Sequence, residues 1–256
     1  MIDPAKDYYC VRFTFSACRF EISVNDIPVL RYDDGGSVST RMFINQFVDS
    51  GKNKLKIVML PQDESGFKLT TMCNISVVHT LGDVERELAQ LSFAFDDTNP
   101  LPVVSLDKDF VIASLPFKAS PWSAIEPHVM TDLEREQLNR GFRRLMSLFT
   151  RKDINEIMSA GRSKDDFYID RYYYPAQERR SYIRNFFSEK FSDSDWQSST
   201  YFENHYKLKE YANSRLYSFE LPNSKSPIEL HNPVSKIRIN VPVFFVYQQG
   251  DYDWIL

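Results

Sequence analysis

Residues 24–61 constrain the fold more than any other part of the chain, because they hold two turn signals next to strand-like runs. Asn25-Asp26 tolerates the left-handed backbone of a tight hairpin and follows a run that alternates polar and apolar residues. Asp49-Ser50-Gly51 predicts a second turn, after which residues 54–59 alternate again. Pro61 has no N–H to give to a strand ladder and ends that run. The pattern predicts half-buried antiparallel strands joined by tight turns.

Similar runs fill the rest of the first half and are separated by turn residues. They are rich in Val, Ile, Thr and Phe, and they cover residues 8–15, 18–24, 27–32, 67–79 and 85–95, with shorter runs at 101–104 and 110–115. Several short strands with turns between them favour an antiparallel β-sandwich or jelly roll. We therefore predict a β-sandwich domain over residues 1–115.

The first half resembles galactose-binding-like β-sandwich domains in two segments, residues 24–29 (Val-Asn-Asp-Ile-Pro-Val) and 45–57 (Asn-Gln-Phe-Val-Asp-Ser-Gly-Lys-Asn-Lys-Leu-Lys-Ile). The resemblance implies a jelly-roll scaffold. In that superfamily the ligand sites differ from loop to loop, so the resemblance carries over no sugar-binding residue.

A proline-dense stretch follows, with five of the 13 prolines between residues 100 and 127. Proline removes hydrogen-bond donors and disfavours helix at the residue before it. We therefore predict a Pro-rich linker over residues 116–130. Trp122 within it is expected either as a wedge between two domains or as a ring on which a ligand stacks.

The second half begins with helical patterns. Thr131-Asp-Leu-Glu134 predicts a capping box ahead of a helix with apolar residues at helical spacing to Phe149. A shorter helix is expected to start at residues 150–153 and to close on Gly161 as a left-handed cap. Residues 167–174 fit no single pattern, and Pro175 is expected to open a third helix as its first residue.

From residue 206 the period shifts to two. Residues 206–221 and 235–247 each predict a long strand, and residues 252–256 a last one, so we predict an α+β domain over residues 131–256. Its order and its ending, Val-Phe-Phe-Val-Tyr-Gln-Gln-Gly-Asp-Tyr-Asp-Trp-Ile-Leu, resemble the cystatin-like α+β cone of the nuclear transport factor two superfamily. That resemblance implies a pocket between helices and a curved sheet. Pro242 departs from it and implies an edge position or a bulge.

Charge and cysteine content narrow the possible partners and the compartment. The net charge of −4 supplies no basic footprint for nucleic acid, and no apolar run reaches the ~20 residues needed to span a bilayer. The first residues show no signal peptide. Cys10, Cys18 and Cys73 match no zinc or redox spacing and are expected as buried free thiols. We therefore predict a soluble cytoplasmic protein with no nucleic-acid or membrane partner.

A catalytic interpretation would combine acidic residues with a histidine for acid–base work. It would use Asp165, Asp166 and Asp170, with His205 near Glu203 and with Asp251 or Asp253. We favour the opposite interpretation, because acidic residues at 165–166 suit a helix N-terminus and residues 203–205 lie in a polar connection. The four histidines (His79, His128, His205 and His231) show no paired ligand spacing. The sequence therefore favours a protein without catalytic residues, metal or cofactor.

The aromatic content and the absence of catalytic motifs favour protein recognition. Tyr and Arg are frequent interface hot spots, so the binding residues are predicted to be Arg171, Tyr172, Tyr173 and Tyr174, with Trp122 and Trp254. We predict a non-catalytic protein-binding module, such as a bacterial immunity-like or accessory protein that occludes a partner protein. Two alternatives remain open. One is a carbohydrate-binding or glycan-modifying protein with Trp122 or Trp254 stacked on sugar rings, and the other is a small-molecule enzyme with its pocket in the C-terminal domain.

Overall fold

The computed structural model describes residues 5–96, 102–199, 205–223, 225–248 and 251–255. Internal contacts divide the chain into two compact units. The first unit comprises Met1–Ser120 together with Arg171–Tyr173, and the second comprises Pro121–Asp170 and Tyr174–Leu256. The first is a β-sandwich and the second an α+β fold, so the predicted fold class is confirmed.

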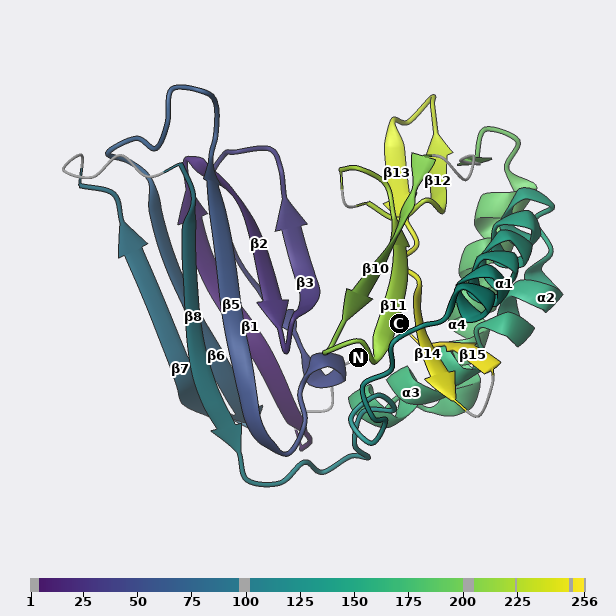
Figure 1. Cartoon of the computed structure of the whole chain (residues 1–256), viewed down its shortest axis with the longest axis horizontal. Coiled ribbons are helices and arrows are strands. Elements are labelled where there is room, and N and C mark those ends of the chain that lie inside the picture. The colour runs from purple at the N-terminus through teal and green to yellow at the C-terminus, as the bar shows by residue number, and fades with distance from the viewer. Residues whose placement is uncertain (1–4, 97–101, 200–204, 224, 249–250, 256) are drawn as a thin grey trace. The chain divides into compact units, whose positions relative to one another are not determined.

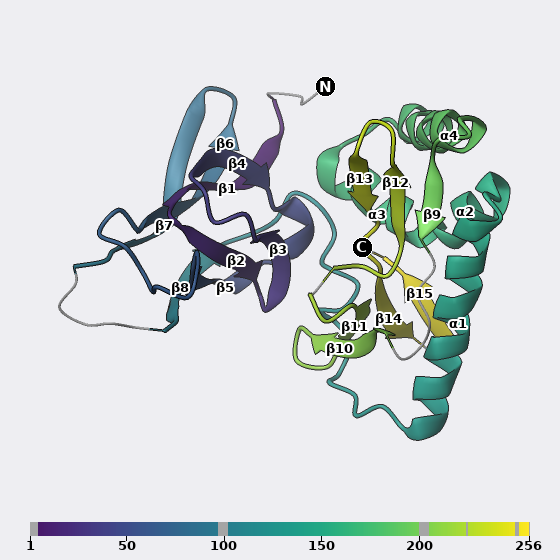
Figure 2. The ribbon, with the colours of Figure 1, turned by 90° about the horizontal axis from the view of Figure 1, so that it is seen from above.

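The first unit consists of two antiparallel sheets of four strands each (Figures 1 and 2). One sheet has the order β4-β1-β6-β7 and the other the order β3-β2-β5-β8. The strands are β1 (Asp7–Ser16), β2 (Cys18–Val24), β3 (Ile27–Tyr32), β4 (Val38–Phe43), β5 (Gly51–Pro61), β6 (Met72–Leu81), β7 (Val84–Ala94) and β8 (Val104–Ile112), with a 3-10 turn η1 (Asn45–Phe47) before β5.

Aromatic rings join the two layers of the sandwich. The Phe15 ring of β1 stacks on the Phe20 ring of β2 with centroids 3.7 Å apart, and Phe13 meets both. Because β1 and β2 belong to different sheets, these rings form the interlayer core. Cys10, Cys18 and Cys73 are buried free thiols, as predicted, and burial raises the pKa of Cys18 to about 11.

The Asn25-Asp26 hairpin is confirmed, since both residues have positive φ, 53° and 64°. Asn53 of β5 ties this hairpin to the turn at 49–51, and its side chain is 1% exposed. Its Oδ1 accepts from Asn25 Nδ2 and from the Asp49 backbone N–H, each at 2.9 Å. Its Nδ2 donates to the carbonyls of Asp49 at 2.7 Å and Gly51 at 3.1 Å. The side-chain amide of Asn53 therefore forms hydrogen bonds with residues of both turns.

Replacing Asn53 with alanine is expected to lower the free energy of unfolding by about 2 kcal/mol, because it removes the four hydrogen bonds of a buried amide, although Asn25 Nδ2 keeps its bond to the Phe47 carbonyl. Urea unfolding of the full chain followed by far-UV circular dichroism measures the loss. Lys52→Ala is the matched control, since the neighbouring Lys52 side chain is 71% exposed and forms only a surface ion pair with Asp109. Equal losses in the two variants would show that the Asn53 network does not stabilise the hairpins.

The second unit combines four helices with short antiparallel strands. The helices are α1 (Asp132–Thr150), α2 (Ile154–Ala160), α3 (Arg162–Tyr172) and α4 (Ala176–Ser192). One sheet has the order β10-β11-β14-β15 and the other β13-β12-β9. The strands are β9 (Gln197–Ser199), β10 (Lys207–Tyr211), β11 (Leu216–Glu220), β12 (Glu229–Asn232), β13 (Ile237–Asn240), β14 (Phe244–Gln248) and β15 (Asp251–Trp254). Within the described ranges, no helix is long and apolar enough to cross a membrane.

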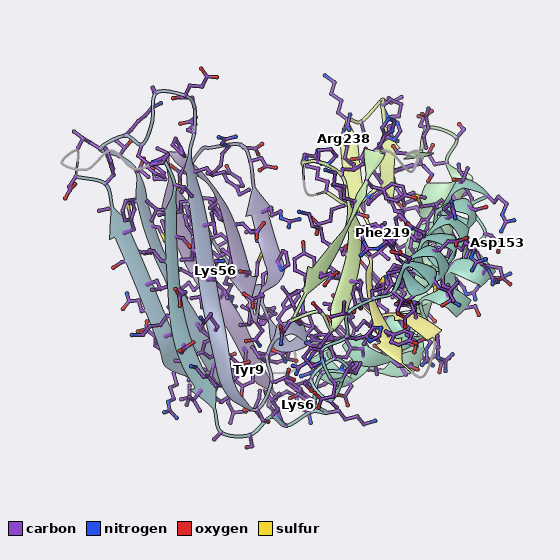
Figure 3. The ribbon with its side chains drawn as sticks, viewed as in Figure 1. Lys6, Tyr9, Lys56, Asp153, Phe219 and Arg238 are labelled. Carbon is purple, nitrogen blue, oxygen red and sulfur yellow. The ribbon has the colours of Figure 1, made fainter. Side chains whose placement is uncertain are left out.

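Helix α1 packs on the sheets through aromatic contacts. The fully buried Phe142 of α1 stacks on Phe219 of β11 with centroids 4.4 Å apart and meets Tyr206 and Phe245 edge-on. Figure 3 labels Phe219 on the sheet beside this helix. The predicted capping box starts α1, since the Thr131 hydroxyl accepts from the Glu134 N–H and the Glu134 carboxylate accepts from the Thr131 N–H.

Several local predictions in this half are corrected by the structure. Residues 206–221 form a hairpin of β10 and β11 rather than one strand, with three turn residues at positive φ, Ala212, Asn213 and Ser214. Residues 235–247 are interrupted at Pro242, between β13 and β14, because proline cannot donate to a ladder. Pro175 lies at the N-cap of α4, one residue before the helix.

Candidate functional site

Two adjoining cavities lie in the second unit among helices α2, α3 and α4. The apolar cavity has a volume of about 250 Å³ and takes its walls from Ile157, Ile183, Phe186 and Trp254, with Lys164 at its lining and Tyr182 beside them. The cationic cavity has a volume of about 730 Å³ and is lined by Arg162, Arg180 and Arg184. Met158 and Asp165 line both, so the two cavities share a wall.

The junction of α2 and α3 places the Trp254 indole at the apolar cavity. Asp153 is the N-cap of helix α2, and its Oδ1 accepts a hydrogen bond from the Glu156 N–H at 3.1 Å. Gly161 is the C-cap of the same helix. A Cβ on Gly161 would lie 3.2 Å from Cζ3 of Trp254. Gly161 has φ −87°, so the predicted left-handed cap is wrong. The glycine instead gives the indole room to approach the helix.

Lys164 and Arg179 are both cations at the lining of the apolar cavity. The Nζ of Lys164 donates to the Pro242 carbonyl at 3.2 Å and lies 4.7 Å from the centroid of the Trp254 ring. Burial, together with the positive charge of Arg179, lowers the pKa of Lys164 to about 7, and Asp165 opposes this shift. The residue as a whole is only partly buried, and the carbonyl and the ring both favour the ammonium form, so these contacts oppose the shift.

Asp165 and Arg179 form the pair next to this amine. Arg179 Nε lies 3.5 Å from Asp165 Oδ1, and the carboxylate is buried. Burial raises the pKa of Asp165, although Arg179 and Arg180 counteract the shift. The Arg179 guanidinium also lies over the rings of Tyr168 and Tyr174, at 5.5 and 5.3 Å. These contacts hold a guanidinium in a fixed place at the edge of the apolar cavity.

The cationic cavity is only partly neutralised by its own carboxylates. Asp166 pairs with Arg180 and, at 3.3 Å, with Arg162. Arg184 donates to the Asn155 side-chain carbonyl at 2.9 Å. The guanidinium of Arg184 thus faces a neutral amide here, and the cavity offers positive charge to an anionic group.

A third cavity, of about 560 Å³, lies between helix α1, helix α2 and strand β15. Arg144, Glu156 and Asp253 contribute its charges, and Tyr252 and Trp254 its rings. Arg144 and Glu156 are 3.7 Å apart. Burial raises the pKa of Tyr252.

The structure separates the residues that the sequence grouped as a binding surface. Arg171, Tyr172 and Tyr173 belong to the first unit, whereas Trp122, Tyr174 and Trp254 belong to the second. Trp122 is 3% exposed and its ring lies 5.5 Å from that of Phe167, and Trp254 is 7% exposed.

Arg171 is fully buried in the first unit. Its guanidinium donates to the Val48 carbonyl at 3.2 Å and to the Ser120 hydroxyl at 2.8 Å, and it lies 4.5 Å from the Phe117 ring. Tyr172 donates to the Gln46 side-chain carbonyl, and Tyr173 meets Tyr8 edge-on. The role of Arg171 and the tyrosines as contacts for a partner protein stays a prediction. The bonds described here show that residues 171–173 also stabilise the first unit.

Three described acidic residues of the catalytic interpretation, Asp165, Asp166 and Asp253, lie in different surroundings. Asp165 lines both adjoining cavities, Asp166 lies in exposed ion pairs, and Asp253 lines the third cavity. Glu203 lies outside the described residues, as does the Asp251 side chain. Among the residues that the structure describes, no cluster of three or more His, Cys, Asp or Glu side chains could hold a metal ion.

Lys164 and the arginines of α4 were not predicted as site residues. Sequence patterns place Arg179, Arg180 and Arg184 on a solvated helix face, and Lys164 in a polar stretch. The only local signal is the density of cations around residues 162–164 and 179–184. In comparisons with protein-family models, with curated proteins and with solved structures, this chain matches none.

Proposed function

We propose that this chain is a non-catalytic protein-binding module whose second unit receives a segment of a partner protein. The segment carries an apolar side chain next to carboxylates. The observation that carries the proposal is the shared wall between the apolar and the cationic cavity. One bound segment can therefore fill the first cavity and place its acidic residues in the second.

The apolar cavity has the features of an anchor site. Its volume of about 250 Å³ suits a large apolar side chain rather than an extended ligand. Tyr182 at the lining is 65% exposed, so its ring is accessible to a bound segment. Tyrosine next to arginine is the composition that dominates interface hot spots.

Charge supports an acidic partner. The chain as a whole carries a net charge of −4, yet the described lining of the two cavities gathers five cations around one carboxylate, Asp165, and Asp166 pairs with two of these cations from beside the lining. The cations are Arg162, Lys164, Arg179, Arg180 and Arg184. Such local complementarity speeds encounter with an acidic segment and disfavours basic ones.

An immunity-like or accessory role, in which the chain occludes its partner, is the broader form of this proposal. Binding of a segment in the two cavities would cover that segment. The carbohydrate alternative is less supported, because the two tryptophans named for sugar stacking, Trp122 and Trp254, are only 3% and 7% exposed.

Selection of a displayed random peptide library against the full chain tests the proposal. We expect enrichment of peptides with a large apolar residue next to Asp or Glu. For a selected peptide, Arg184→Glu is expected to weaken affinity at least about tenfold, which corresponds to 1.4 kcal/mol, because it reverses the charge of the cationic cavity. Isothermal titration calorimetry measures the change.

Arg86→Glu is the matched control, since it makes the same charge change on β7, in the other unit. Its affinity for the peptide should stay within about twofold of the original. A library that yields no peptides, or only basic ones, would contradict the proposal, and so would equal losses in the two variants.

A further inference from the structure

We propose that the cationic cavity receives a phosphoserine or phosphothreonine of the partner segment, next to the apolar side chain that fills the neighbouring cavity. This inference rests on the proposed function, because it names the chemistry of the same segment. It adds that phosphorylation of the partner strengthens binding to this chain.

The charge around the cationic cavity matches a dianion better than a single carboxylate. Four guanidinium groups lie at the two adjoining cavities, together with the carboxylates of Asp165 and Asp166. Four positive and two negative charges leave a net charge of +2, to which a charged Lys164 adds. A phosphate monoester carries about −1.5 to −2 at pH 7, whereas an Asp or Glu side chain carries −1.

The ion pairs of Asp166 leave the arginines available to a ligand. The side chains of Arg162 and Asp166 are 62% and 51% exposed, and an exposed ion pair contributes little to stability. Arg184 donates to the neutral amide of Asn155. These guanidinium groups can therefore turn to phosphate oxygens without leaving a buried charge unpaired, and their forked geometry suits a phosphate group.

The first turn of α4 adds donors of a second kind. Ala176 and Gln177 line the cationic cavity, and the N-cap residue Pro175 forms no side-chain hydrogen bond with the helix. The first N–H groups of a helix have no acceptor within it, and the helix dipole favours negative charge at this end. Ser181, further along α4, also lines the cavity and carries a hydroxyl donor. Backbone and side-chain donors thus join the arginines.

The apolar cavity determines which residue lies beside the phosphate. The two cavities share Met158 and Asp165 in their walls, so one segment can fill both with neighbouring side chains. The cationic cavity, of about 730 Å³, has room for a phosphate and the short stretch of chain that carries it. We therefore expect a large apolar residue next to the phosphoserine or phosphothreonine.

Three synthetic peptide libraries test this on the full chain. They are identical except for a fixed central residue, which is phosphoserine, aspartate or serine. Peptides retained by the immobilised protein are sequenced by mass spectrometry, and the best phosphopeptide is prepared with each of the three central residues. By isothermal titration calorimetry we expect the phosphoserine form to bind at least about tenfold more tightly than the aspartate form, because it offers more charge and more acceptor oxygens to the arginines.

Arg184→Gln should lower this preference to below about threefold, because it removes a guanidinium that the described carboxylates do not neutralise. Arg140→Gln is the matched control, since Arg140 is exposed on α1 and is not among the described lining residues of the three cavities. Its preference should stay within about twofold of the original. The comparison of the three peptides is made on the unchanged protein, so it does not depend on how a variant folds.

Equal affinity of the phosphoserine and aspartate forms would overturn the inference and leave the proposed function standing. A preference that survives Arg184→Gln unchanged would also overturn it, because the phosphate would then bind elsewhere. Retention of the phosphoserine library alone would support the inference and contradict the recognition of carboxylates. If the protein retains none of the three libraries, both proposals are wrong.

Discussion

Replacement of Arg171 by methionine is expected to lower the free energy of unfolding of the full chain by about 3 kcal/mol, because it removes a buried and hydrogen-bonded cation. The side chain is 0% exposed. Its loss leaves the Val48 carbonyl and the Ser120 hydroxyl without their donor, and it removes the cation 3.7 Å from the Asp49 carboxylate. Methionine keeps much of the volume of the stem, so the effect reports the guanidinium rather than a cavity.

The choice of probe matters, because all three tryptophans, Trp122, Trp196 and Trp254, belong to the second unit. Urea unfolding of the Arg171 variant is therefore followed by far-UV circular dichroism, which also reports the sandwich. Arg162→Met is the control, since that side chain is 62% exposed and forms a surface pair, and a change within about 0.5 kcal/mol is expected. If Arg171→Met were as mild as the control, the buried guanidinium would not hold the segment in place.

Replacement of Phe142 by alanine is expected to cost about 4 kcal/mol in the second unit, because it removes a large ring from a packed aromatic cluster. The ring is 0% exposed and contacts Tyr206, Phe219 and Phe245. Alanine also removes the stacked ring pair with Phe219. Such a pair stabilises the fold by more than the burial of its apolar surface alone.

Tryptophan fluorescence during urea unfolding measures this loss. Leu133→Ala on the same helix is the control, since Leu133 is 63% exposed and its truncation should change stability by no more than about 0.5 kcal/mol. A Phe142 variant that unfolds at the urea concentration of the original protein would show that α1 does not depend on this cluster.

Features with local causes could be predicted from the sequence. The Asn25-Asp26 turn and the Thr131–Glu134 capping box depend on neighbouring residues, and both are present as expected. The β-sandwich could be predicted from the alternation of polar and apolar residues. In a strand with one buried face, every second side chain points to the core and is apolar. Helix α3 was not predicted, since apolar and polar residues are interleaved along it without a clear face.

The cavities could not be predicted because their walls come from separate parts of the chain. Lys164 lies on α3, Arg179 on α4, and Trp254 at the end of β15. Composition also failed to distinguish an interior from an interface. Arg171 and the tyrosines after it have the composition of a hot spot, yet the guanidinium is buried within the first unit.

The membership of Arg171–Tyr173 in the first unit has a consequence for synthesis on the ribosome. A chain that folds from its N-terminus has all eight sandwich strands once residue 112 has emerged, but it lacks the Arg171 guanidinium until about 60 further residues have followed. Until then the Val48 carbonyl and the Ser120 hydroxyl lack the hydrogen bonds that this guanidinium donates. The first unit is thus completed late, and no single cleavage of the polypeptide yields two fragments that each contain a whole unit.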